Sequence, residues 1–112
     1  MTATGLRIHF IKRPSPGFWD ILENRRIKTP GFSESLLPTD SVGLIQGNAA
    51  SVLAAADVAE KAAAIQVAEV RGVCPSHLTM IAVYGDTSAV AAALTAVRRH
   101  LAETLLSEDD EL

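Results

Sequence analysis

The sequence contains very few cysteines and aromatic residues. One cysteine among 112 residues cannot form an internal disulfide, so nothing in the chain requires an oxidising compartment. Aromatic residues make up 4% of the chain although hydrophobic residues make up 48%, because much of the apolar content is alanine. Since each alanine buries little area, a chain of this kind often completes its burial against copies of itself.

The sequence also lacks a long uncharged apolar run, a signal-peptide pattern and an excess of positive charge. Charged residues interrupt the apolar stretches before they reach the roughly 20 residues that a membrane-spanning helix needs. Residues 1–5 do not have the basic, apolar and small-residue order of a signal peptide. The formal net charge is -3, which gives no electrostatic reason for a nucleic acid partner. We therefore expect a cytoplasmic protein with neither a membrane nor a nucleic acid as partner.

The chain is predicted to form a single domain over residues 1–112. Residues 6–27 are expected to hold a strand, in which apolar residues alternate, and a short helix over residues 18–26 with Trp19 and Leu22 on one side. Prolines and a glycine mark residues 28–40 as a linker. The core is expected over residues 41–106, and the acidic tail, residues 107–112, is expected to fray.

Two strand–helix modules are predicted within the core. A strand over residues 41–46 leads into a helix that Asn48 caps, and strands over residues 65–71 and 78–84 precede a second helix capped by residues 85–87. Spacings of 4, 3 and 4 give this helix one apolar stripe of Val90, Leu94, Val97 and Leu101. The predicted fold class is α+β, a single ferredoxin-like α/β sandwich with helices over one face of an antiparallel-rich sheet.

Four segments of the core form a recognisable pattern: VGLI at 42–45, AAADVAEKAA at 54–63, VYGD at 83–86 and SAV at 88–90. Through these segments the core resembles the bacterial microcompartment shell domain. In that family, a strand of the GLI or GMV kind leads into a helix with the pattern A-A-D-x-x-x-K-A-A, and a later strand ends in G-D. The last strand of the family usually resembles V-H-V-I-P-R-P, and its match here, IHFIKRP at residues 8–14, stands at the N-terminus. This order resembles the circularly permuted, single-domain hexameric subclass of ethanolamine- and propanediol-type shell proteins.

The resemblance implies a structural protein and not an enzyme, with no cofactor and no metal. Six copies would form a homohexameric tile with a central pore. Such tiles would assemble with other shell proteins into the shell of a bacterial microcompartment, a cytoplasmic organelle that encloses enzymes. The pore would control the passage of metabolites.

Two basic residues match those through which neighbouring hexamers of this family contact each other at their edges. Lys61 matches the lysine at the hexamer edge; the alternative is a solvated helix lysine paired with Asp57 at i−4. Arg13 matches the arginine of P-R-P at the same edge, where its planar fork suits backbone carbonyls across a seam. The alternative for Arg13 is a strand-end arginine in water.

A loop between two predicted strands aligns with the pore loop of the family, which is often K-I-G-S-G. The residues expected to line the pore are Val73, Cys74, Pro75, Ser76 and His77. A ring of His77 would respond to pH near neutrality, whereas the alternative is an ordinary hairpin turn. Cys74 and His77 supply only two of the four ligands that structural zinc needs, so no metal site is predicted.

Two other functions compete with the shell tile. A small ferredoxin-like regulatory module would bind a small molecule at subunit interfaces, but the chain has no glycine-rich ligand loop, and that interpretation leaves the displaced strand unexplained. A small dimeric barrel enzyme would need a coherent catalytic set, which the sequence does not contain.

Overall fold

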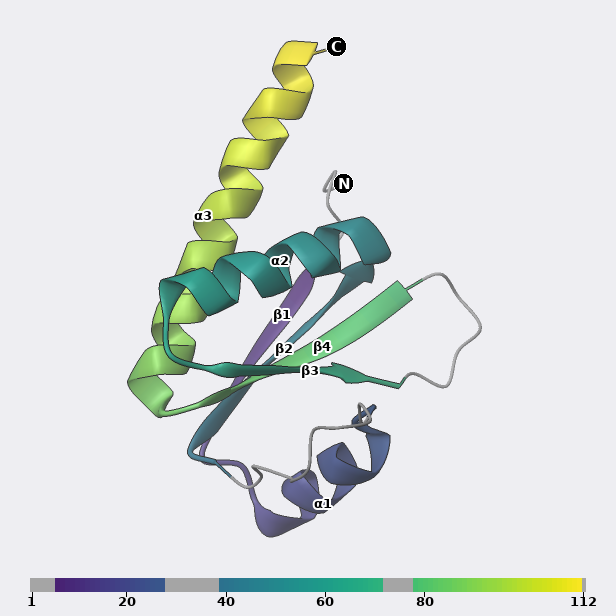
Figure 1. Cartoon of the computed structure of the whole chain (residues 1–112), viewed down its shortest axis with the longest axis vertical. Helices are drawn as coiled ribbons and strands as arrows, with labels where there is room; N and C mark the ends of the chain where they lie inside the picture. The colour runs from purple at the N-terminus through teal and green to yellow at the C-terminus, as the bar shows by residue number, and fades with distance from the viewer. Residues whose placement is uncertain (1–5, 28–38, 72–77, 112) are drawn as a thin grey trace.

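The computed structural model of the protein describes residues 6–27, 39–71 and 78–111. The elements in chain order are β1 (Arg7–Lys12), α1 (Pro16–Arg25), β2 (Ser41–Asn48), α2 (Ala49–Ala62), β3 (Gln66–Val70), β4 (Leu78–Gly85) and α3 (Thr87–Glu111) (Figure 1). The predicted α+β class is confirmed. In the described part of the chain, no helix is both long and apolar enough to cross a membrane.

The strands form one antiparallel sheet in the order β1-β2-β4-β3. The displaced strand at the front of the chain takes an outer place in this sheet. It pairs with β2 along its whole length, from Arg7 opposite Gln46 to Lys12 opposite Ser41. The chain therefore adds its first strand beside its second, and β4 lies between β2 and β3.

The long helices α2 and α3 cover one face of the sheet, as predicted (Figure 1). Fully buried residues of this layer are Ile45, Val52, Ala55, Ala59, Val83, Val90, Ala93, Leu94 and Val97. Leu6, Ile8 and Phe10 of the displaced strand pack against them, which agrees with the predicted apolar face of that strand. Gly43 permits the closest approach, because a methyl group at its Cα would lie 2.9 Å from both δ-carbons of Leu94.

The short helix α1 covers the opposite face, so the sandwich has a third layer (Figure 1). Trp19 and Leu22 are 8% and 5% exposed, and they pack with Val42, Val70, Ala82 and Tyr84. The sequence-based expectation of helices over a single face is therefore incomplete. Because both faces are covered, the central strands contain continuous runs without alternating polar residues, VGLI at residues 42–45 of β2 and MIAVY at residues 80–84 of β4.

Two helix ends differ from the sequence-based expectation. Helix α1 begins at Pro16, before the expected residue 18, because Ser15 caps it by accepting a hydrogen bond from the Phe18 nitrogen, and proline fits the first helical position. Helix α3 continues to Glu111, so residues 107–111 of the tail that was expected to fray are helical (Figure 1). The 25 residues of α3 contain neither glycine nor proline, which would have ended the helix earlier. Asn48 caps α2 as predicted, by accepting from the Ser51 nitrogen at 2.9 Å.

Candidate functional site

Lys61 lies on the last turn of α2 with its ammonium group at the surface. Its Nζ is 2.9 Å from Oδ2 of Asp57, and the two side chains are 76% and 61% exposed. An exposed i,i+4 pair of this kind contributes only about 0.3–0.5 kcal/mol to the helix. The pairing is weak enough for another acceptor to replace Asp57, so Lys61 is accessible to a neighbouring chain. Its role at a hexamer edge remains a prediction.

Arg13 follows β1 in a backbone conformation that few non-glycine residues adopt. Its φ is 48°, in the left-handed region, which costs roughly 1–2 kcal/mol for an ordinary residue. Its backbone N–H donates to the Asp40 carbonyl at 3.0 Å and to the Ser41 hydroxyl at 3.4 Å. These bonds hold the turn, and the residue is exposed. The edge role predicted for Arg13 also remains a prediction.

A polar joint connects the start of β2 to the start of α3 beside Arg13. Oδ2 of Asp40 accepts a hydrogen bond from the Thr87 backbone nitrogen at 3.1 Å and a second, very short one from the Thr87 hydroxyl. The Thr87 hydroxyl also bonds the fully buried Ser41 hydroxyl at 2.6 Å. The bonds from Thr87, assisted by the nearby positive charge of Arg13, hold the pKa of the Asp40 carboxyl below its usual value.

Sequence reasoning assigned the cap of α3 to residues 85–87, which is only partly correct. The carbonyl of Asp86 accepts from the Val90 nitrogen at 2.9 Å, as an N-cap carbonyl does. The carboxylate that binds the N–H of Thr87 belongs to Asp40, 47 residues earlier. No local sequence pattern reports such a contact, because it exists only once β2 and α3 lie side by side.

The two predicted edge residues lie toward the same end of the sheet. The turn after α2 contacts the last residue of β4, since a methyl group built on Gly85 would lie 3.7 Å from the Ala64 carbonyl oxygen. Thr87, two residues after Gly85, forms part of the polar joint beside Arg13 through its bond to Asp40. The C-terminal end of α2, the N-terminal end of α3 and the end of β1 therefore gather on one side of the molecule (Figure 1).

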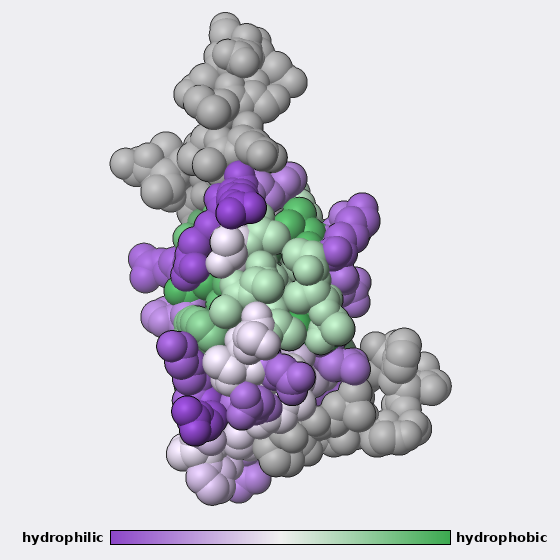
Figure 2. Space-filling model, turned by 90° about the vertical axis from the view of Figure 1, so that its left-hand side faces the viewer, coloured by the Kyte–Doolittle hydropathy of each residue, from purple (hydrophilic) through white to green (hydrophobic). Residues whose placement is uncertain are grey.

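The surfaces of α2 and α3 carry many small side chains. Their exposed or half-buried alanines include Ala62 at the end of α2 and Ala89, Ala91, Ala92 and Ala96 of α3. Figure 2, which views the molecule from the left-hand side of Figure 1, shows a weakly hydrophobic patch bordered by hydrophilic residues. Small side chains allow another backbone to approach closely, although each contributes little buried area.

The loop expected to line a pore, residues 73–77, lies outside the described residues. The strands on either side of it are described, and the loop connects Arg71 to the start of β4 at the sheet end opposite Gly85. The eight residues of β4 are separated by seven steps of about 3.4 Å, so the two ends of the strand lie about 24 Å apart. The fold therefore places the predicted edge cations at the sheet end opposite Arg71 and the start of β4, the described residues that flank the loop.

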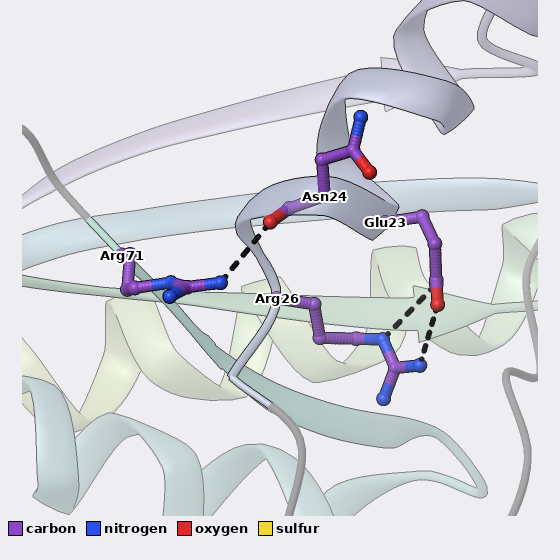
Figure 3. A network of polar contacts seen from close by, with 4 residues as sticks. All are labelled: Glu23, Asn24, Arg26 and Arg71. Atoms are coloured by element: carbon purple, nitrogen blue, oxygen red, sulfur yellow. Dashed lines mark hydrogen bonds and ion pairs between the residues drawn. The ribbon is translucent and has the colours of Figure 1, made fainter.

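An arginine-rich cluster adjoins this loop, at the C-terminal end of α1. Arg26 donates from Nε and Nη2 to the two carboxylate oxygens of Glu23, at 3.2 and 3.0 Å (Figure 3). This pairing raises the pKa of Arg26 above its ordinary value. Nη2 of Arg71 donates to the Asn24 carbonyl at 3.2 Å, and Nη1 of Arg25 donates to the Arg71 carbonyl at 3.4 Å.

Sequence reasoning missed this cluster because it combines distant parts of the chain. The backbone of Arg26 forms an isolated antiparallel bridge with Val70, flanked by bonds from Ile27 N to Glu69 O and from Arg71 N to Arg25 O, both 2.8 Å long. The adjacent Arg25 and Arg26 were the only local signal. A metal centre is a separate question: among the described residues, no group of three or more His, Cys, Asp or Glu could hold an ion.

Comparison with known proteins identifies relatives of the chain. The family model of the BMC domain matches residues 41–109. The ligand-free GrpU microcompartment shell protein from Clostridiales bacterium 1_7_47FAA is 33% identical, with a TM-score of 0.65 over 89% of this chain and 96% of that one. The GrpU shell protein from Pectobacterium wasabiae is 27% identical, with a TM-score of 0.61 over 82% of this chain and 99% of that one.

A third similar structure shares the fold. The fused permuted hexameric shell protein from the RMM microcompartment is 24% identical, with a TM-score of 0.65 over 88% of this chain and 46% of that longer one. No curated protein sequence matches the chain.

Proposed function

Since the chain belongs to the BMC domain family of bacterial microcompartment shell proteins, in the circularly permuted form, we propose that six copies of it form a shell tile with a central pore. Its function is structural: the tile forms part of the wall of a microcompartment within the cytoplasm. Such a wall prevents free exchange of metabolites between the microcompartment and the cytoplasm, so metabolites pass through the central pore of the tile.

The position of β1 is the observation that carries this proposal. The strand precedes the family-matched residues 41–109 in sequence, yet it pairs with β2 at six successive positions. A displaced strand of this kind distinguishes the permuted shell domain from other proteins built of strand–helix modules. The match to 96% of a GrpU shell protein at 33% identity supports the same conclusion over nearly the whole chain.

The distribution of polar groups supports the geometry of a tile. A flat ring of subunits needs one end of each subunit at the axis and another at the rim. We propose that the loop 73–77, at one end of the sheet, lines the pore. Lys61 and Arg13 then lie toward the rim, where each can bind an acceptor of the next tile. The weakly hydrophobic patch seen in Figure 2 offers an apolar surface to a neighbouring subunit.

The proposed partners are other copies of this chain, other shell proteins of the same compartment and the enzymes that it encloses. No catalytic role is proposed for the chain. The competing interpretation, a ligand-sensing regulatory module, finds no support, because the family match and the similar structures above are all of microcompartment shell proteins.

Native mass spectrometry of the purified chain tests the proposed oligomer. Six chains of 11.9 kDa give an expected mass of about 71 kDa. A hexamer supports the tile. A dimer or trimer that persists at all concentrations contradicts it, and would direct attention to ligand sites between subunits.

A further inference from the structure

The cluster at the end of α1 surrounds a cavity of about 390 Å³ that is open to solvent on one side. Its lining consists of Glu23, Asn24, Arg26, Ile27 and Arg71. Backbone hydrogen bonds join the segment that carries Arg26 and Ile27 to the edge of β3 next to Arg71, and so hold three of the lining residues in place. A volume of this size suits a small metabolite.

The arginine side chains in and beside this cavity differ in how many of their N–H donors already form hydrogen bonds. Arg26 is held in a two-bond pair with Glu23, and its side chain is 12% exposed. Arg71, by contrast, is exposed, and among the described residues its guanidinium donates only to the Asn24 carbonyl. A guanidinium has five N–H donors, so this contact orients Arg71 and leaves most of its donors for another acceptor. Figure 3 shows Arg71 pointing toward the last turn of α1.

The charges of the cluster favour an anion. Among the described residues that form its printed contacts, the cations Arg25, Arg26 and Arg71 outnumber the carboxylate of Glu23. Lysine would offer only a point charge, whereas the planar fork of arginine matches the two oxygens of a carboxylate or phosphate. Because Glu23 already neutralises Arg26, the uncompensated positive charge lies nearer Arg71 and Arg25.

We propose that this cavity binds the carboxylate or phosphate group of a small anionic metabolite, with Arg71 as the principal ligand. Arg26 lines the wall, and Asn24 orients Arg71 through its carbonyl. A site of this kind lies in every subunit and binds the anion whether or not the subunits assemble.

The site gains a role in transport if the proposed function holds. Arg71 is followed directly by residue 72 and the loop expected to line the pore. In a hexamer with that loop at its axis, six such sites would lie near the entrance and raise the local concentration of anions. That role rests on the proposed function, whereas the binding itself does not.

Titration of the full chain with inorganic phosphate, and separately with acetate, tests the site. Sodium chloride at equal ionic strength is the reference. We expect the arginine Nε–Hε NMR signal of Arg71 to shift in a saturable way with at least one of the two anions. A wild-type titration in which the Arg71 signal follows ionic strength alone overturns the proposal.

Two matched variants locate the binding. Arg71→Gln removes the charge of the side chain but keeps its backbone hydrogen bond to Arg25. We expect the affinity for the anion to fall by a factor of roughly ten or more relative to wild type. Arg98→Gln removes an equally exposed arginine from α3, and we expect unchanged affinity. Equal losses in both variants identify general charge attraction and overturn the proposed site. If Arg71→Gln fails to fold, the wild-type titration decides alone.

Native mass spectrometry of the same sample separates the two proposals. A hexamer without saturable binding contradicts the anion site and leaves the tile standing. Saturable binding in a sample that is not hexameric supports the site and contradicts the tile.

Discussion

The carboxylate of Asp40 lies 3.1 Å from the backbone nitrogen of Thr87 and so joins two segments that are 47 residues apart. The first N–H groups of a helix have no partner within the helix, and the helix dipole favours a negative charge beside them. Asp40 supplies both the acceptor and the charge. The same contact positions the start of β2 against α3, beside the turn at Arg13.

Acid is expected to weaken this joint. The pKa of Asp40 is lower in the folded protein than its ordinary value of 3.8, so the carboxylate contributes stability above that value. This contribution is lost as the pH falls through the folded pKa. Asp40→Asn should therefore lower the free energy of unfolding at pH 6, and the difference from wild type should shrink below about pH 4. Urea unfolding, followed by the fluorescence of Trp19, measures it.

Asp20→Asn is the control for this prediction, because Asp20 is an exposed aspartate on α1, away from the joint. Its effect should be small at pH 6. A pH-independent difference between Asp40→Asn and wild type would show that the charge of Asp40 has no role.

Lys61→Ala is expected to separate assembly within a tile from assembly between tiles. The variant loses the ion pair with Asp57, which contributes only about 0.3–0.5 kcal/mol to the stability of the helix, so the fold and the hexamer should remain. Extended sheets should disappear in electron micrographs, because the rim loses its cation. Glu60→Ala, an exposed neighbour on the same helix, should still form sheets. Sheets formed by Lys61→Ala as readily as by wild type contradict the edge role.

Arg13→Gly is expected to change stability and tiling independently. Glycine adopts a φ of 48° without the cost that arginine pays, but it also has more freedom in the unfolded chain. The two effects oppose each other, so the free energy of unfolding should stay within about 1 kcal/mol of wild type. Sheet formation should weaken because the guanidinium is lost. Light scattering measures the assembly of tiles, and thermal unfolding measures stability, so the two effects can be separated. Scattering equal to that of wild type would indicate that Arg13 is only solvated and has no edge role.

Gly43→Ala is expected to destabilise the protein by about 1–3 kcal/mol. The added methyl group would meet both δ-carbons of Leu94 at 2.9 Å, and Leu94 is only 1% exposed, so little free space surrounds it. Gly17→Ala is the matched control, since no atom outside its chain neighbours lies within 4 Å of the new methyl group. It should be neutral or stabilising by up to about 1 kcal/mol. Denaturant unfolding measures both, and equal effects would contradict close packing of α3 on β2.

Much of the fold could be predicted because its signals are local. Asn48 caps α2, Ile8 and Phe10 share one face of β1, and Val90, Leu94 and Val97 form the buried stripe of α3. Each of these follows from spacing within a few residues. The displaced strand was also recognisable, because its residue pattern remains intact wherever it stands in the chain.

The functional residues divide in a different way. Resemblance selected Lys61, Arg13 and the loop 73–77, and the two cations lie toward the sheet end opposite the described residues that flank the loop. The arginine cluster had no such signal, because Arg71 and Asn24 meet only after the segment that follows α1 joins the edge of β3.

The sequence by itself determined where helices and strands form and which family the chain resembles, because periodicity and capping act between near neighbours. Only the tertiary structure decided that α1 covers the second face, that Asp40 caps a helix 47 residues later, and that Arg71 faces the end of α1. These contacts depend on how the sheet orders its strands. A hydrogen bond between distant residues leaves no periodic trace in the sequence, since either partner alone resembles any exposed polar residue.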